Sequence, residues 1–120
     1  MIDIDTLNIL SKFDGTSSGD VVEMLHRIDG GTLCLMSCGS KAYLPDYFND
    51  SNAIRLLIEC ANEKQIIKYA KILAFSLNRY PPHWNGGDIA AILSATPEQH
   101  AIAFCEMINQ ERNEKWKTKT

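Results

Sequence analysis

An apolar stripe in the middle of the chain changes phase at residues 62–64. Apolar side chains recur at helical spacing from residue 54 and again from residue 66. They are Ile54, Leu57, Ile58 and Ala61, followed by Ile66, Ile67, Ala70, Leu73, Ala74 and Leu77. One straight helix would need apolar residues where Gln65 and Lys68 stand. Two helices that meet at a tight turn each keep a buried face, so the sequence predicts a helical hairpin from Ser51 to Tyr80.

Two more helices are predicted before this hairpin. The first begins at Asp3 or Asp5, either of which can act as an N-cap, and ends before a turn-forming cluster at residues 14–19. The second begins near Ser18 or Asp20 and stops at a pair of glycines, Gly30 and Gly31. Its apolar stripe consists of Val21, Val22, Leu25 and Ile28.

Residues 32–36 are the one stretch that favours a strand. They form a short apolar run bounded by glycines. A turn at residues 39–41 would pair them with residues 42–44, and Pro45 would end the pairing. The alternative for this segment is a buried loop.

The C-terminal part of the chain predicts a short helix and a long one. Asp88 is expected to cap a helix over residues 89–93. The run from Thr96 to Gln99 combines an N-cap threonine with proline at the first helical position, and a helix is expected from there to about Lys115. No aliphatic residue follows Gln110, so the end from about residue 111 is expected to be solvated and frayed.

The expected fold is mainly α, a compact bundle of about five to six short helices in a single helical domain over residues 1–120. A small two-stranded hairpin near residues 32–44 is part of this expectation, and an α+β fold is the alternative. The chain is 45% hydrophobic and 22% charged, which is typical of a globular domain. A domain of this length buries roughly two-thirds of its unfolded surface, so it needs no metal or disulfide to fold.

The N-terminus and the cysteines favour the cytoplasm. Asp3 and Asp5 stand where a signal peptide would carry basic residues, and no apolar run approaches the ~20 residues of a membrane span. We therefore expect no membrane association and free, mostly buried thiols. The four cysteines are Cys34, Cys38, Cys60 and Cys105.

Two places in the sequence carry residue types that bind metals. Cys34 and Cys38 have the spacing of zinc ligands, and His26 lies upstream, but a structural zinc site needs a second close pair. His100 and Cys105 would lie about 140° apart around a helix and would not converge. We expect no metal and no cofactor.

A cysteine nucleophile is the second chemical hypothesis. Cys38 lies in a plausible exposed turn, and His26 or His83 is its candidate base. No cysteine follows a helix-capping residue that would stabilise a thiolate. A cysteine-dependent hydrolase or transferase is therefore the second alternative function.

A helix-turn-helix is the first alternative function. Residues 88–104 have its outline, a short helix with small alanines, a tight turn and a capped second helix. Candidate nucleic-acid contacts are Gln99, His100, Arg112, Lys115, Lys117 and Lys119. Glu98 would repel phosphates at the start of the second helix, and the net charge of −3 disfavours nucleic acid as a partner.

Two aromatic loops are candidate partner-binding surfaces. The first is stiffened by a Pro-Pro pair, and both hold the residue types that dominate binding hot spots. Their candidate residues are Arg79, Tyr80, Pro82, His83 and Trp84 in one loop, and Tyr43, Tyr47 and Phe48 in the other. The alternative is that Trp84 folds back into the core, and that part of the second loop is buried.

The sequence thus predicts a small non-enzymatic interaction or regulatory module that binds another protein or a second copy of itself. This hypothesis is favoured by elimination, because no group of residues reaches the specificity that catalysis requires.

Overall fold

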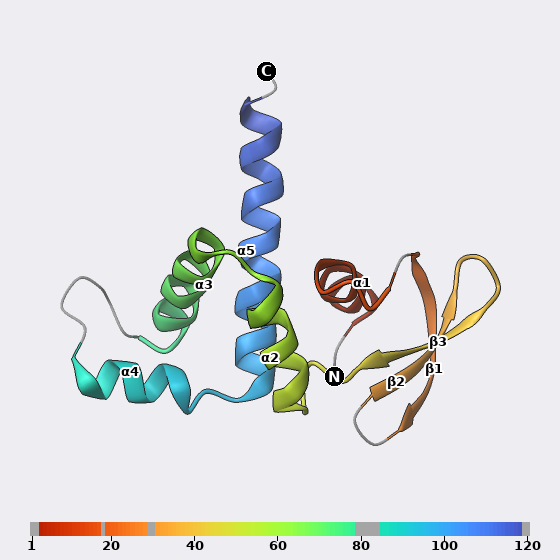
Figure 1. Cartoon of the computed structure of the whole chain (residues 1–120), viewed down its shortest axis with the longest axis horizontal. Coiled ribbons are helices and arrows are strands. Elements are labelled where there is room, and N and C mark those ends of the chain that lie inside the picture. Colours follow the sequence, from red (N-terminus) through yellow and green to blue (C-terminus); the bar gives the residue numbers. More distant parts are fainter. Residues whose placement is uncertain (1–2, 18, 29–30, 79–84, 119–120) are drawn as a thin grey trace.

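The computed structural model describes residues 3–17, 19–28, 31–78 and 85–118, which form five α-helices and one three-stranded antiparallel sheet (Figure 1). The elements are α1 (Ile4–Phe13), β1 (Val21–Ile28), β2 (Gly31–Met36), β3 (Lys41–Pro45), α2 (Ser51–Cys60), α3 (Glu63–Ser76), α4 (Gly86–Leu93) and α5 (Pro97–Thr118). The fold is α+β, so the stated alternative is correct and the mainly helical prediction holds only in part.

The molecule is flatter and more extended than the predicted compact bundle. Its extents are 49 × 42 × 21 Å and its radius of gyration is 15.3 Å, against about 14 Å for a compact chain of this length. Helix α5 runs through the middle, with α3 and α4 on one side and α1 and the sheet on the other (Figure 1). The C-terminal part of α5 extends beyond the other helices, which accounts for the larger radius.

Strand β1 replaces the helix predicted from Ser18 or Asp20 to the glycine pair at residues 30–31. It pairs with β2 through the register Val21–Met36, Glu23–Leu35, Met24–Cys34 and His26–Leu33, with irregularities after residues 21 and 24. Each irregularity adds an unpaired residue, which turns the two-residue alternation of a strand into a three-residue spacing. Val22 and Leu25 are these unpaired residues, and both belong to the apolar stripe that predicted a helix, so the helix prediction was wrong for this reason.

The hairpin of β2 and β3 is confirmed, with Gly39 at φ +89° in its turn. Gly31 belongs to β2 and is not a helix stop. A Cβ atom at Gly31 would lie 2.5 Å from the carbonyl oxygen of Leu44 and 2.7 Å from the ring of Tyr43. Only glycine therefore allows this close packing, because the ring of Tyr43 lies where a side chain at this position would be.

The predicted helical hairpin is also confirmed, as α2 and α3. Asn62 caps α3, since its side chain accepts from the backbone N–H of Gln65 and the Gln65 side chain accepts from that of Asn62, both at 2.9 Å. Helix α3 ends at Ser76, earlier than predicted, and Asn78 adopts a left-handed conformation at φ 60°.

Helices α1 and α5 begin at their predicted caps. Asp3 caps α1, and Thr96 and Gln99 exchange reciprocal hydrogen bonds at the start of α5. Helix α4 begins at Gly86, before the predicted cap Asp88. None of the helices in the described ranges has the length and apolar content to cross a membrane.

The core is centred on α5. The ring of Phe104 stacks on Tyr69 of α3 at a centroid distance of 4.1 Å and contacts Phe13 of α1 at 6.0 Å. Fully buried side chains from four helices surround these rings: Leu7, Leu10, Leu57, Leu73 and Met107. Buried sheet residues on the α1 side join the same cluster, namely Val21, Cys34, Met36 and Leu44.

Candidate interaction surfaces

The predicted cysteine–histidine pair is not assembled in the described residues. His26 is paired with Leu33, whereas Cys38 lies in the turn beyond Met36. These points are roughly 10 Å or more apart along the strand. The Cys38 thiol contacts the Ser40 hydroxyl at 2.9 Å, and this hydrogen bond lowers the pKa of Cys38. The other candidate base, His83, lies outside the described residues.

The cysteines are free but less buried than expected. Cys34 is buried in the sheet, whereas Cys38 and Cys60 are exposed and Cys105 is half-buried. Burial raises the pKa of both Cys34 and Cys105. The described residues contain no group of three or more His, Cys, Asp or Glu side chains placed to hold a metal ion.

The candidate nucleic-acid contacts Gln99 and His100 make contacts within the chain. The Gln99 side chain accepts from the backbone N–H of Thr96 at 2.9 Å. His100 is half-buried, and its Nδ1 is hydrogen-bonded to the hydroxyl of Tyr69. Burial lowers the pKa of His100, so its ring is neutral near pH 7. Arg112 is exposed, and the side chains of Lys115, Lys117 and Lys119 lie outside the described part of the chain.

The first aromatic loop, with its candidates Arg79, Tyr80, Pro82, His83 and Trp84, lies outside the described residues. In the second loop, Tyr47 is fully buried, and its hydroxyl donates to Asp14 Oδ2 at 2.5 Å. Burial raises the pKa of Tyr47. Tyr47 is therefore a core residue and is not available to a partner in this conformation, which corrects its assignment. Phe48 is half-buried, and Tyr43 is 50% exposed.

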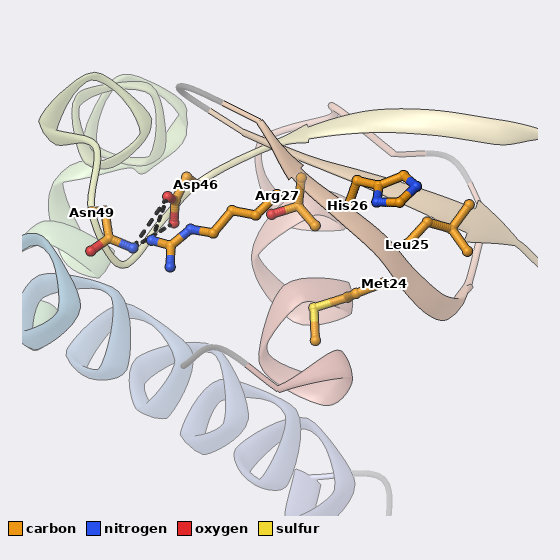
Figure 2. A pocket seen from close by; sticks show the side chains of 7 residues that line it. Met24, Leu25, His26, Arg27, Asp46 and Asn49 are labelled. Atoms are coloured by element: carbon orange, nitrogen blue, oxygen red, sulfur yellow. Dashed lines mark hydrogen bonds and ion pairs between the residues drawn. The ribbon is translucent and has the colours of Figure 1, made fainter.

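A pocket of about 220 Å³ lies where β1 approaches the loop after β3 (Figure 2). The Asp46 carboxylate is buried there. It accepts hydrogen bonds from Arg27 at 3.0 Å and from Asn49 at 3.1 and 3.2 Å. These contacts connect β1 to the loop that precedes α2. The sequence does not reveal the Arg27–Asp46 pair, because the two residues are far apart in the chain and carry no common motif.

A second hollow, of about 270 Å³, lies between α2 and the link from α4 to α5. We call it the α2–α5 groove; it is lined by Ser51, Ile54, Arg55, Ile58, Leu93, Ala95, Pro97 and His100. Leu93 is 77% exposed and Ile58 is 41% exposed. The sequence placed Ile58 on a buried stripe, and its exposure depends on how α4 and α5 are arranged, which local spacing does not reveal.

Comparison with protein-family models, curated proteins and solved structures gives no significant match. The function is therefore inferred from these surfaces.

Proposed function

We propose that this chain is a non-enzymatic protein-binding module and that the α2–α5 groove is its docking surface. The observation that carries the proposal is the exposure of Leu93 at 77% beside Ile58 at 41% in one hollow. Contiguous exposed apolar side chains in a concave setting are typical of binding sites, because water contact with them is unfavourable.

The partner that fits this groove is an amphipathic helix with an acidic residue beside its apolar face. Helices line the groove, and a helix has already satisfied its own backbone hydrogen bonds, so the groove favours a helical partner over a strand. Arg55 lies at the groove with its side chain 78% exposed, in an ion pair with Glu59 at 3.3 Å. Such an exposed pair contributes only about 0–1 kcal/mol, so a partner carboxylate can replace Glu59.

Two further observations support this proposal over the alternatives, and a third supports the expected location. Among the described residues, Cys38 and His26 do not come together, as a cysteine-dependent enzyme using this pair would need. Gln99 and His100, which a helix-turn-helix would use on a base, are engaged within the chain. The free state of all the cysteines supports the cytoplasm as the place where the module acts.

The experiment uses a fluorescein-labelled amphipathic peptide with a leucine face flanked by glutamates, titrated with the full chain and followed by anisotropy. We expect Leu93→Asp to weaken binding at least about 10-fold, because it places a charge in the apolar hollow. The matched control is Ile102→Asp, at a position of α5 that is 49% exposed and does not line the groove. It should bind like the unmodified chain.

Two outcomes would contradict the proposal. One is binding that Leu93→Asp and Ile102→Asp reduce equally, or not at all. The other is no peptide binding together with tight, steeply salt-dependent binding of duplex DNA, which would favour the nucleic-acid alternative. Melting curves of both variants, expected to match that of the unmodified chain, show that any loss of binding is not a loss of folding.

A further inference from the structure

The face of the sheet that points away from α1 carries two rows of side chains in register. Residues that pair directly across antiparallel strands point to the same face. The pairing therefore sets Glu23, Leu35 and Lys41 in one row and His26, Leu33 and Tyr43 in the next. We call these six residues the outer sheet face. The alternate residues of the strands, such as Val21, Cys34 and Leu44, are buried on the other face.

The outer sheet face is apolar along its middle and open to solvent. Leu33 and Leu35 on the central strand are half-buried, and Tyr43 beside them is 50% exposed. Helix α1 packs on the opposite side, toward which Met24 points, while His26 lies on the outer side (Figure 2). In Figure 1, the sheet stands at the far side of α1 from the helices, and no described helix lies beyond it.

The charges at the two ends of one row have opposite sign. Glu23 and Lys41 are both exposed, and among the described residues neither forms an ion pair. They are on opposite sides of the central strand, with their backbones about 9–10 Å apart and Leu35 between them. The row thus runs from acid through leucine to base.

We propose that the outer sheet face binds a second copy of this chain, with the two sheets packed face to face about a two-fold axis parallel to β2. Rotation about that axis exchanges the β1 and β3 sides and keeps each position along the strands. Glu23 of each copy then lies opposite Lys41 of the other, and the Leu33 and Leu35 side chains of the two copies meet along the axis. This surface is self-complementary, which a two-fold interface requires.

Sheet twist does not remove this match. Facing sheets pack about 10 Å apart with their strands rotated by about 30°. At the neighbouring strands, about 4.8 Å from the axis, such a rotation moves a residue by only about 2–3 Å. The long side chains of Glu23 and Lys41 span this offset, whereas the leucines on the axis hardly move.

The size of the face predicts a weak dimer. Its footprint is roughly 15 Å in each direction, or a few hundred Å² for each copy, whereas a stable dimer buries about 800 Å² for each partner. The association should therefore be reversible and dependent on concentration. Because the Glu23–Lys41 contacts would lie at the rim, raised salt should weaken it further.

The test is sedimentation equilibrium of the full chain from about 10 µM to about 1 mM, the range in which a weak dimer forms. The unmodified chain should fit a monomer–dimer equilibrium. Lys41→Glu alone, and Glu23→Lys alone, should each weaken dimerisation at least about 10-fold, because each sets like charges opposite one another. The double variant Glu23→Lys/Lys41→Glu should recover dimerisation, since its row is again self-complementary.

Lys64→Glu, at an exposed position of α3, makes the same charge change away from the sheet and should dimerise normally. The proposal is overturned if the unmodified chain stays monomeric throughout, or if the folded double variant is no better a dimer than the single ones. It is also overturned if dimerisation is lost in Leu93→Asp and not in Leu35→Asp, because the second copy would then occupy the α2–α5 groove. Circular dichroism of every variant checks that it is folded.

Discussion

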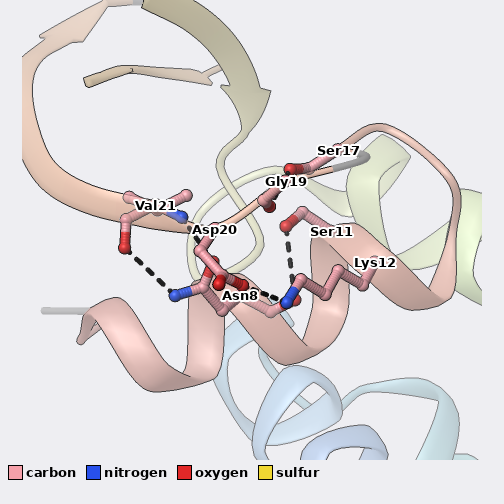
Figure 3. Close-up of polar contacts among 7 residues, drawn as sticks. All are labelled: Asn8, Ser11, Lys12, Ser17, Gly19, Asp20 and Val21. Atoms are coloured by element: carbon pink, nitrogen blue, oxygen red, sulfur yellow. Dashed lines mark hydrogen bonds and ion pairs between the residues drawn. The ribbon is translucent and has the colours of Figure 1, made fainter. Parts of the chain in front are cut away.

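The elements on the two sides of α5 are held in place by different kinds of contact. On the sheet side, polar side chains of α1 bind β1 in addition to the apolar packing of the core. The Asn8 amide accepts from the backbone N–H of Val21 at 2.7 Å and donates to its carbonyl oxygen at 3.2 Å, and Lys12 pairs with Asp20 (Figure 3). On the helical side, the contact between α3 and α5 is dominated by the stacked rings of Tyr69 and Phe104.

The difference follows from the backbone N–H and C=O groups that each kind of element leaves without a hydrogen-bond partner. An edge strand has backbone N–H and C=O groups with no neighbouring strand, and they need polar partners when they are covered. Asn8 supplies both partners at once, as a neighbouring strand would. A helix satisfies its interior backbone by itself, so apolar packing is enough to fix its position.

The largest expected effect is at the ring that joins the two sides. Phe104 is fully buried and contacts both Phe13 and Tyr69. Phe104→Ala should lower the free energy of unfolding by about 3–5 kcal/mol, measured by urea denaturation, because it leaves a large cavity. Ile102→Ala, at a half-exposed position of the same helix, should change it by only about 0.5 kcal/mol. Two separate transitions in the unmodified chain would instead show that the sides of α5 unfold independently.

A smaller effect is expected where the sheet side depends on polar contacts. Asn8→Ala removes both hydrogen bonds to Val21 and should cost about 1–3 kcal/mol, because two backbone groups lose their partner in a part-buried place. Asn52→Ala removes an exposed amide of the same kind from α2 and serves as the control. In Asn8→Ala, the rate of amide hydrogen exchange should increase most at the start of β1. If Asn8→Ala costs no more than Asn52→Ala, packing alone holds α1 on the sheet.

The sequence predicted the structural features that depend on residues close together in the chain. The caps at Asp3 and Thr96 lie within a few residues of the N–H groups that they satisfy, and the change of phase near Asn62 is likewise local. Strand β1 was missed because its two irregularities imitate helical spacing. The Tyr47–Asp14 and Arg27–Asp46 contacts join residues far apart in the chain, so no local pattern could reveal them.

The surfaces proposed from the structure differ from those that the sequence indicated. The sequence indicated the two aromatic loops, whereas the structure buries Tyr47 of the second loop and exposes Leu93 of α4. Whether an apolar residue on a helix is covered depends on which elements pack beside it, and this follows from the whole fold. The outer sheet face could not be recognised before the register of β1 was known, because the match of Glu23 with Lys41 exists only through that register.

The smallest expected effect is on the pH dependence of stability. It tests whether the ring contacts of the helical side include a titratable group, His100, or act as apolar packing alone. The folded state lowers the pKa of His100 from its ordinary 6.5 because burial penalises the charged ring. As the pH falls through about 6.5, the unfolded chain therefore takes up a proton that the folded chain does not, so stability decreases. His100→Gln keeps a polar group near Tyr69 but cannot titrate. Denaturant unfolding from about pH 8 to about pH 5 should then show a shallower loss of stability in the variant. Parallel curves for the two proteins would mean that His100 is protonated equally in the folded and unfolded chains and that its burial carries no penalty.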